Sequence, residues 1–343
     1  MKPRISYSQF VAQQPKNTVA ALIERYITEM ATSPEMKPCG ESQTYTLRAM
    51  ARTPLGEKLA LKITKSDVIA YCRMRRQQFV INTTRLVTPM TVGKEVSCLG
   101  VVLKYAGSGA WEDCFDVSSA AVDAAKKFLV KHGLISKGNH RTRVPTDDEL
   151  RRITEYLKDL ESRGRSTISY IPVLLFALAS TRRLGEICRM TYGDIDWDHK
   201  DKDGNPAPMY VIRDVKHPTK KKGNDVRFAL LDPMPEILRM QKRLTDDPAE
   251  RVFPYNPKSI SQGYIEAKKK LGIEGLRFHD NRREATTRWL AILKDPALVK
   301  FITGHTTGKM VETTYNATDS VAAPHAAFAE FVKRQAAQQV QPG

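Results

Sequence analysis

One β-rich segment in an otherwise helical chain limits what this sequence can fold into. Residues 208–231 hold MYVIRDV and VRFALL, two runs rich in β-branched and aromatic residues, on either side of the lysine-rich HPTKKKGND. Two such runs around a polar connection predict an antiparallel β-hairpin with a long basic tip. Helical patterns return after Asp232 and continue almost to the end. We therefore expect a mainly α fold with a small antiparallel β-sheet, in the α+β class.

Three segments of the first third are expected to be helices: residues 18–30, 66–79 and 88–105. Ser66 is the expected N-cap of the second helix, whose end carries Arg73, Arg75 and Arg76. The expected core faces of the first and third helices are Val19, Leu22, Ile23, Tyr26 and Ile27, and Val92, Val96, Leu99, Val102 and Leu103. Together these segments predict a small helical domain with one cationic side.

A polar, basic stretch at residues 136–145 (SKGNHRTRVP) ends in Pro145 and predicts an exposed linker. A second domain begins directly after it, because Thr146-Asp-Asp-Glu149 is a capping-box pattern in front of the amphipathic LRRITEYLKDL. Residues 169–190 are expected to form a largely apolar helical region. The predicted organisation is a helical domain over 1–135, the linker, a second domain over 146–318, and a C-terminal helix or tail over 319–343.

The charge balance indicates a polyanionic partner. The 343 residues include 55 Lys and Arg against 38 Asp and Glu, a formal net charge of +17, which favours nucleic acid over a membrane surface. The five cysteines form no CxxC pair, so reduced thiols in a cytoplasm fit better than a zinc ribbon or a disulfide framework. The start lacks a signal-peptide pattern, and the longest apolar stretch, residues 171–179, is far shorter than the roughly 20 residues of a membrane helix. We expect a soluble, cytoplasmic protein.

Four short segments of the second domain suit phosphoryl chemistry: Arg183-Leu-Gly-Glu186, residues 222–227 (KGNDVR), His279-Asp-Asn-Arg282, and Gly304-His305 with Tyr315 ten residues later. Transfer of a phosphodiester to a side chain needs a nucleophile, cations for the charge that grows on the phosphate oxygens, and an acid for the leaving oxygen. Guanidiniums bind phosphate through paired hydrogen bonds, and lysine or histidine can move the protons. A tyrosine hydroxyl can serve as the nucleophile. No acidic cluster of the kind that holds Mg²⁺ is evident, so no metal site is expected.

In their order and spacing, these segments resemble the catalytic domain of the tyrosine recombinases, the phage integrase family. The resemblance covers about residues 146–318, and residues 18–107 resemble the helical core-binding domain that the family places in front. It implies that Tyr315 is the nucleophile and that Glu186 supports Arg183 from behind. The other implied catalytic residues are Arg183, Lys222, His279, Arg282 and His305.

Two assignments keep an alternative. Arg182 competes with Arg183, because Thr181-Arg182 replaces the family's usual Gly-Leu, and Lys220 or Lys221 could stand for Lys222. The separation of His305 from Tyr315 is one residue longer than the commonest spacing in the family.

Each of these residues also has an ordinary structural explanation. The two arginines could be helix-surface charges, the lysines a solvated turn, and the histidines and Tyr315 plain core or surface residues. Trp289 and Leu290 are interpreted as core and not as a platform for stacking bases. The expected contacts to the DNA backbone are Arg73, Arg75, Arg76, Lys220, Lys221, Arg141 and Arg143.

The resemblance implies a site-specific DNA recombinase whose two domains form a C-shaped clamp on double-stranded DNA. Cleavage would pass through a 3′-phosphotyrosyl bond and a Holliday junction, in a homo-tetramer on two DNA sites, with no metal, ATP or other cofactor. Residues 321–336 are expected to form a helix that docks on a neighbouring subunit. The sequence leaves open whether accessory DNA-bending proteins take part. It also leaves open whether the protein is a bacterial one associated with the nucleoid or is encoded by a phage or mobile element. The competing interpretations are a type IB topoisomerase and a catalytically idle DNA-binding protein.

Overall fold

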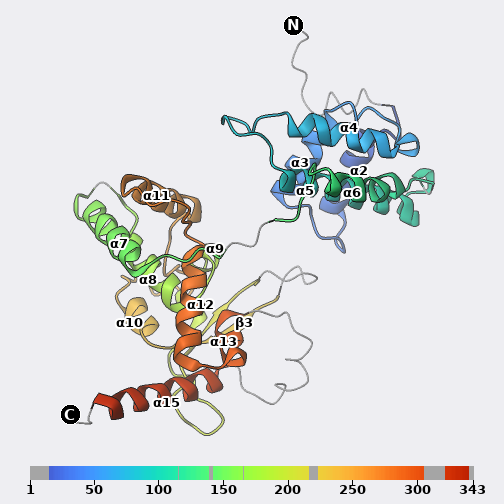
Figure 1. Ribbon diagram of the computed structural model, residues 1–343. Helices are drawn as coiled ribbons and strands as arrows, with labels where there is room; N and C mark the ends of the chain where they lie inside the picture. Colours follow the sequence, from blue (N-terminus) through green and yellow to red (C-terminus); the bar gives the residue numbers. More distant parts are fainter. Residues whose placement is uncertain are drawn as a thin grey trace. The chain divides into compact units, whose positions relative to one another are not determined.

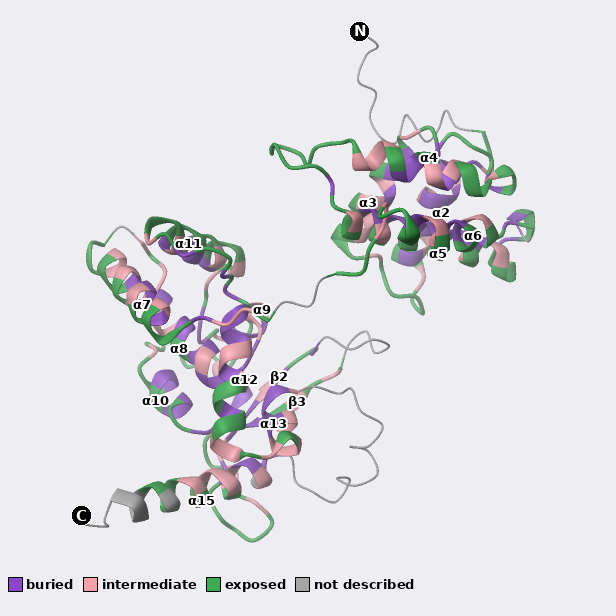
Figure 2. Ribbon diagram, in the orientation of Figure 1, coloured by how far each residue is buried: buried purple, intermediate pink, exposed green. Residues whose placement is uncertain are grey.

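The computed structural model (Figure 1) describes residues 15–114, 116–138, 142–164, 166–215, 223–304 and 321–339. The chain divides into two compact units, Met1–His140 and Arg141–Gly343. Each unit has a hydrophobic core of its own, visible as the buried faces in Figure 2. The division falls within residues 136–145, the segment expected to be the linker. The mainly helical architecture with one small antiparallel sheet confirms the predicted fold class.

The first unit is a bundle of α-helices with short 3₁₀ and π turns. Its α-helices are α2 (Val19–Thr32), α3 (Glu41–Ala51), α4 (Lys65–Arg76), α5 (Pro89–Tyr105) and α6 (Ala120–Lys131). The short turns are η1 (Ala60–Lys62), η2 (Ala106–Ala110) and η3 (Glu112–Cys114). All ten residues predicted for the core faces of α2 and α5 are buried.

The structure corrects one expectation for the first unit and contains a helix, α3, that was not predicted. Thr64, and not Ser66, caps α4: its side chain accepts a hydrogen bond from the Asp67 backbone N–H, while the Asp67 carboxylate accepts one from the Thr64 N–H. Helix α3 lies in a stretch that shows only a weak apolar stripe, with Leu47, Met50 and Ala51 buried. Its helical state therefore depends on packing against α2 and α5 more than on local pattern.

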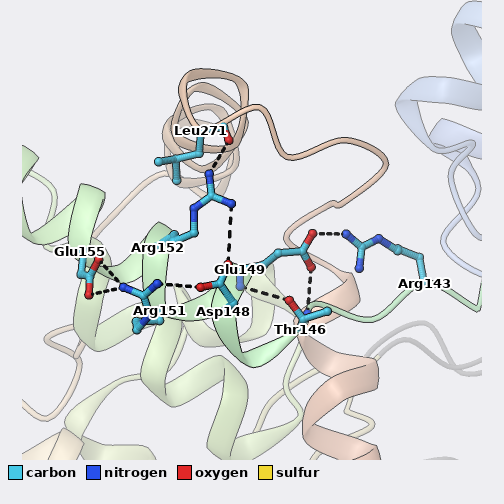
Figure 3. Close-up of polar contacts among 8 residues, drawn as sticks. All are labelled: Arg143, Thr146, Asp148, Glu149, Arg151, Arg152, Glu155 and Leu271. Carbon is cyan, nitrogen blue, oxygen red and sulfur yellow. Dashed lines mark hydrogen bonds and ion pairs between the residues drawn. The ribbon is translucent and has the colours of Figure 1, made fainter.

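The second unit combines helices with a three-stranded antiparallel sheet. These are α7 (Asp147–Ser162), α8 (Tyr170–Ser180), α9 (Leu184–Ile187), α10 (Met234–Arg239), α11 (Pro257–Lys270), α12 (Asp280–Leu293), α13 (Pro296–Thr303) and α15 (Ala322–Gln339). The predicted capping box is present at the start of α7, where Thr146 and Glu149 exchange hydrogen bonds (Figure 3). The 3₁₀ turn η4 (Tyr192–Asp194) leads into the sheet.

The sheet contains the predicted hairpin. Strands β2 (Met209–Ile212) and β3 (Val226–Ala229) pair antiparallel, with Tyr210 opposite Phe228. A third strand, β1 (Ile195–Asp196), pairs with β2 and was not predicted. The tip at residues 216–222 lies outside the described residues.

The apolar region expected over residues 169–190 is two helices and not one. Helix α8 ends at Thr181, whose φ of 59° is left-handed, and α9 starts after Arg183. Further along, Trp289 is buried as expected and donates from its indole N–H to the Ala179 carbonyl oxygen (2.6 Å). Leu290 was wrongly assigned to the core, since it lies on the exposed side of α12.

The C-terminal helix α15 packs on its own unit, against α12, α13 and β3. The Phe328 ring meets the Trp289 ring edge to face at 5.7 Å between centroids, and a ring nitrogen of His325 lies 2.8 Å from the Pro208 carbonyl oxygen. Val332, further along the same helix, remains exposed. The helix expected over residues 321–336 is present, and its docking on a neighbouring subunit stays a prediction. All five cysteines are free thiols. None of the described helices is long and apolar enough to cross a membrane.

Candidate active site: guanidiniums around a buried carboxylate

The turn between α8 and α9 presents Arg183 beside Glu186. Arg183 is the N-cap residue of α9, and Glu186 is the third residue of that helix. The carboxylate accepts hydrogen bonds from the Arg183 backbone N–H (3.0 Å) and from its guanidinium (2.6 Å). Glu186 is buried, whereas the Arg183 side chain is 39% exposed. A fixed carboxylate thus holds a guanidinium that remains open to solvent.

The electrostatics of Glu186 indicate a site with excess positive charge. Burial alone would raise the pKa of this carboxyl, because the charged form loses water. The hydrogen bonds from Arg183 and the charges of Arg182 and Arg183 outweigh burial, and the pKa is lowered. Glu186 is therefore ionised throughout the neutral range.

Arg282 reaches the same place from α12. Its guanidinium donates to the Thr181 carbonyl oxygen (2.7 Å) and to the Thr303 carbonyl oxygen (2.8 Å), so it joins the end of α8 to the end of α13. Burial, followed by repulsion from Arg182 and Arg183, lowers the pKa of Arg282 to about 10. Arg282 still carries its charge at neutral pH.

Arg182 is the most deeply buried member of the cluster, at 2% exposure. It donates to the carbonyl oxygens of Ser180 (3.0 Å) and Ile302, and its guanidinium carbon lies 3.6 Å from the centre of the Phe228 ring. Among the residues that the structure describes, no carboxylate forms an ion pair with Arg182. The sequence could not distinguish Arg182 from Arg183 as the first catalytic arginine. In the structure Arg182 lies inside the unit, whereas Arg183 faces solvent.

The close packing around Arg182 explains a glycine. Gly304 ends α13 with a φ of 65°, and a Cβ there would lie 3.0 Å from the Phe228 ring and 3.3 Å from the Arg182 guanidinium. Both the backbone conformation and the lack of space require glycine at this position. His305 follows directly in the sequence. The end of α13, directly before His305, is therefore fixed by contacts with Arg182 and Arg282 and by the conformation of Gly304.

His279 precedes α12 at the exposed edge of the same cluster. Its pKa is lowered, first by partial burial and then by the charges of Arg282 and Arg183. The neutral imidazole is therefore the form present near pH 7, and it can accept a proton.

The structure brings together four of the predicted residues: Arg183, Glu186, His279 and Arg282. The other three catalytic predictions, Lys222, His305 and Tyr315, lie outside the described residues. Searched over the described ranges, the chain has no group of three His, Cys, Asp or Glu side chains arranged to hold a metal ion. Chemically, the guanidiniums of this arrangement can donate hydrogen bonds to an anion with several oxygen acceptors, such as a phosphodiester.

Comparison with known proteins identifies the family of this chain. The model of the phage integrase family matches residues 143–321, which is 179 of the 343 residues. The chain belongs to the phage integrase family.

Two relatives of this chain have names that include recombinase. A putative integrase/recombinase of Haemophilus influenzae is 24% identical over 310 residues, covering 89% of this chain and 88% of the relative. A shufflon-specific DNA recombinase of Escherichia coli is 23% identical over 283 residues, covering 81% of this chain and 63% of the relative.

Solved structures share the fold at low sequence identity. The Tn1549 transposon integrase in complex with transposon right-end DNA matches with a TM-score of 0.60 and 14% identity, covering 93% of this chain and 99% of that one. A lambda integrase tetramer bound to a Holliday junction matches with a TM-score of 0.58 and 14% identity, covering 93% and 85%. The chain thus has the fold of tyrosine recombinases.

The arginines predicted to contact DNA from α4 differ in their surroundings. Arg75 is bound within the integrase, where its guanidinium donates to the buried carboxylate of Glu95 (2.9 and 2.5 Å) and to Gln78. The guanidinium of Arg76 donates to the Val87 carbonyl oxygen. Arg73 is exposed on the helix surface. Of the three, Arg73 presents a guanidinium that is not used in this network, whereas Arg75 has a structural role.

The linker arginine Arg143 is also held inside the second unit. Its guanidinium donates to the Glu149 carboxylate, which takes part in the capping box of α7, and to the Val144 carbonyl oxygen (2.5 Å), as Figure 3 shows for the carboxylate. The other predicted contacts, Arg141, Lys220 and Lys221, lie outside the described residues.

A pocket of about 980 Å³ between α3 and α5 was missed by the sequence interpretation. It includes three lysines, Lys94, Lys126 and Lys137, and hydrogen-bonding side chains from Ser42, Gln43, Thr46 and Ser97. Apolar side chains such as Val96, Val101 and Val130 supply most of its surface, and the lysines and hydrogen-bonding groups lie among them. The signal was present on the side of residues 88–105 opposite the core stripe, where Lys94 and Ser97 are spaced by three residues.

Proposed function

We propose that this integrase breaks and rejoins double-stranded DNA at specific sites through a tyrosine nucleophile. The observation that carries the proposal is the cluster of three guanidiniums, Arg182, Arg183 and Arg282, around the buried carboxylate of Glu186. Such a cluster has an excess of fixed positive charge, which stabilises the extra negative charge of a phosphoryl transition state. Arg183 and Arg282 are assigned to the phosphate oxygens.

The remaining roles rest on the family motifs. The Tyr315 hydroxyl oxygen attacks the scissile phosphorus and forms a 3′-phosphotyrosyl bond, while the bond to the 5′-oxygen breaks. Lys222 gives its proton to that leaving oxygen, and His279, neutral near pH 7, accepts the proton of the phenol. His305 is assigned to a hydrogen bond with the phosphate. In the second step a 5′-hydroxyl of a partner duplex attacks phosphorus and releases Tyr315. One phosphoester replaces another, so the reaction needs no ATP and no metal ion.

DNA binding is assigned to both units, which would enclose the duplex as a clamp. In the first unit we assign it to the pocket between α3 and α5 and to Arg73. The similarity to an integrase tetramer on a Holliday junction supports a homo-tetramer on two DNA sites that exchanges strands in pairs. Phosphate contacts would supply much of the affinity, which predicts strong salt dependence.

A nicked substrate tests the proposal. A duplex selected by the protein from a random pool is nicked next to the cleavage position, so that the released fragment diffuses away and the covalent complex accumulates. We expect a protein–DNA adduct that resists denaturation with the wild type and none with Tyr315→Phe. Binding without any adduct would indicate a catalytically idle DNA-binding protein. Adduct formation without joining of two differently labelled duplexes would indicate a topoisomerase.

A further inference from the structure

Residues 77–87, between α4 and α5, form a small hairpin that projects from the first unit (Figure 2). The Val80 N–H donates to the Arg85 carbonyl oxygen (2.8 Å) and the Val87 N–H to the Gln78 carbonyl oxygen (2.9 Å). Asn82, with a φ of 58°, makes the turn. We call this segment the 77–87 hairpin.

The tip of the 77–87 hairpin is apolar and exposed. Phe79 is 61% exposed and Ile81 is 69% exposed, and Val80 and Leu86 beside them are also exposed. Neighbouring apolar side chains in contact with water are unfavourable, and on soluble proteins such patches mark binding surfaces. We therefore expect the tip to bind a partner.

The 77–87 hairpin is also held in one conformation. The Thr83 hydroxyl donates to the Val80 carbonyl oxygen (2.9 Å), and at the base the Arg76 guanidinium donates to the Val87 carbonyl oxygen. A hairpin fixed at tip and base loses little conformational entropy when it binds, so it can insert its side chains at low cost.

The charge around the hairpin identifies the kind of partner. No Asp or Glu occurs from Val68 to Lys94, a stretch that contains Arg73, Arg85 and Lys94. The hairpin leads directly into α5, whose first turns supply Met90 and Lys94 to the pocket between α3 and α5. An apolar tip within a wholly cationic stretch fits a polyanion with an apolar interior, which describes duplex DNA.

We propose that the 77–87 hairpin inserts Phe79 and Ile81 into the minor groove of the bound duplex and opens a base step there. This inference rests on the proposed function, in which duplex DNA is the partner. Phe and Ile are among the side chains that proteins use as wedges between base pairs, and the resulting kink lets the DNA follow more of the protein surface. Arg73 and Arg85 would contact the phosphates on either side.

The test uses the full-length protein and the selected duplex described above, with 2-aminopurine placed at successive positions. We expect wild-type binding to raise the fluorescence at one step, which reports unstacking. The double variant Phe79→Ala/Ile81→Ala is expected to lose this rise and to bind about tenfold more weakly. Its affinity should keep the wild-type dependence on salt, because apolar contacts release no counterions. Leu61→Ala, an exposed leucine on η1 of the same unit, is the matched control and should behave as wild type.

Lys94→Gln serves as the comparison for the salt dependence. Loss of one phosphate contact should lower the slope of log affinity against log salt concentration by about one, with the unstacking signal unchanged. Wild-type affinity and unstacking in the double variant would overturn the inference. So would a loss confined to cooperative binding of several subunits, or a loss of binding to anionic vesicles with DNA binding unchanged. A wild type that binds and unstacks the duplex but never forms the covalent adduct would remove the proposed function and leave the hairpin assignment standing.

Discussion

Each unit of this protein has a buried carboxylate that binds an arginine, and the two networks differ in their balance of charge. In the first unit Glu95, 5% exposed, accepts hydrogen bonds from one arginine, Arg75, and from the Tyr71 hydroxyl (2.8 Å). In the second unit Glu186, 4% exposed, bonds Arg183 and also interacts with the charge of Arg182, and both of these arginines lower the pKa of Arg282.

The difference separates a charge-balanced pair from a cluster with excess positive charge. One carboxylate with one guanidinium is neutral, so the Glu95 network has no charge left for a ligand. In the second unit three guanidiniums share one carboxylate, so the guanidiniums repel one another. This repulsion lowers the stability of the fold unless other interactions or a bound anion compensate for it. The predictions below test this contrast, from the largest expected effect to the smallest.

Arg183→Ala should slow cleavage of the nicked duplex by roughly 10²–10³-fold, because one of the groups that stabilise the transition state is lost. Single-turnover formation of the covalent adduct measures this rate. The matched control is Arg189→Ala, an exposed arginine six residues further along. It should cleave at the wild-type rate, and an equal loss in both variants would contradict the role given to Arg183.

Arg75→Ala should act on stability and not on chemistry. It leaves Glu95 buried with a hydrogen bond from Tyr71 but without its guanidinium, and we expect the free energy of unfolding of the first unit to fall by about 3 kcal/mol. Denaturant unfolding measures the change. The double variant Arg75→Leu/Glu95→Leu should recover most of the loss, since removing both charges leaves neither of them buried alone. Adduct formation per folded molecule should stay close to wild type.

Arg182→Met tests whether Arg182 supports cleavage through its hydrogen bonds or through its charge. The variant keeps an apolar side chain against Phe228 but loses the hydrogen bonds to the Ser180 and Ile302 carbonyl oxygens. We expect cleavage to slow by about tenfold, because the end of α13 is less well fixed. Arg182→Lys, which keeps the charge without the planar fork, should not restore the rate. Full activity of the lysine variant would show that charge alone matters.

His279 should make a small, pH-dependent contribution to stability. Its pKa in the folded protein lies below the ordinary 6.5, so the unfolded chain takes up the proton first as the pH falls. The wild type should therefore lose stability relative to His279→Asn below about pH 6.5, and the difference should be constant above that pH. Thermal unfolding of both proteins at several pH values measures it. An opposite slope would mean that the histidine is held in its charged form.

Local patterns predicted a good part of this molecule. The core stripes of α2 and α5, the Thr146–Glu149 capping box and the β2–β3 hairpin follow from periodicity or from spacings of a few residues. The pairing of Arg183 with Glu186 is also local, since three residues of one short helix separate them.

Features that depend on distant contacts could not be predicted. The pattern gave no sign that the chain breaks at Thr181, because the left-handed turn is held by a hydrogen bond from its hydroxyl to Ile302, 121 residues away (3.1 Å). Arg75 was expected on the surface, since nothing near it in the sequence shows that Glu95 would be buried against it. The polar side of residues 88–105 can be seen in the sequence, but the pocket between α3 and α5 exists only once the two helices pack.

The span of these contacts has a consequence during protein synthesis. The acceptors of Arg182 and Arg282 at residues 302 and 303 lie 120 and 21 positions later in the chain. A ribosome-bound chain that has not yet released α13 cannot assemble the anion site, however well its earlier helices have formed. The arrangement of Arg182 and Arg282 therefore forms only when translation is nearly finished, and a product that terminates before α13 would lack it.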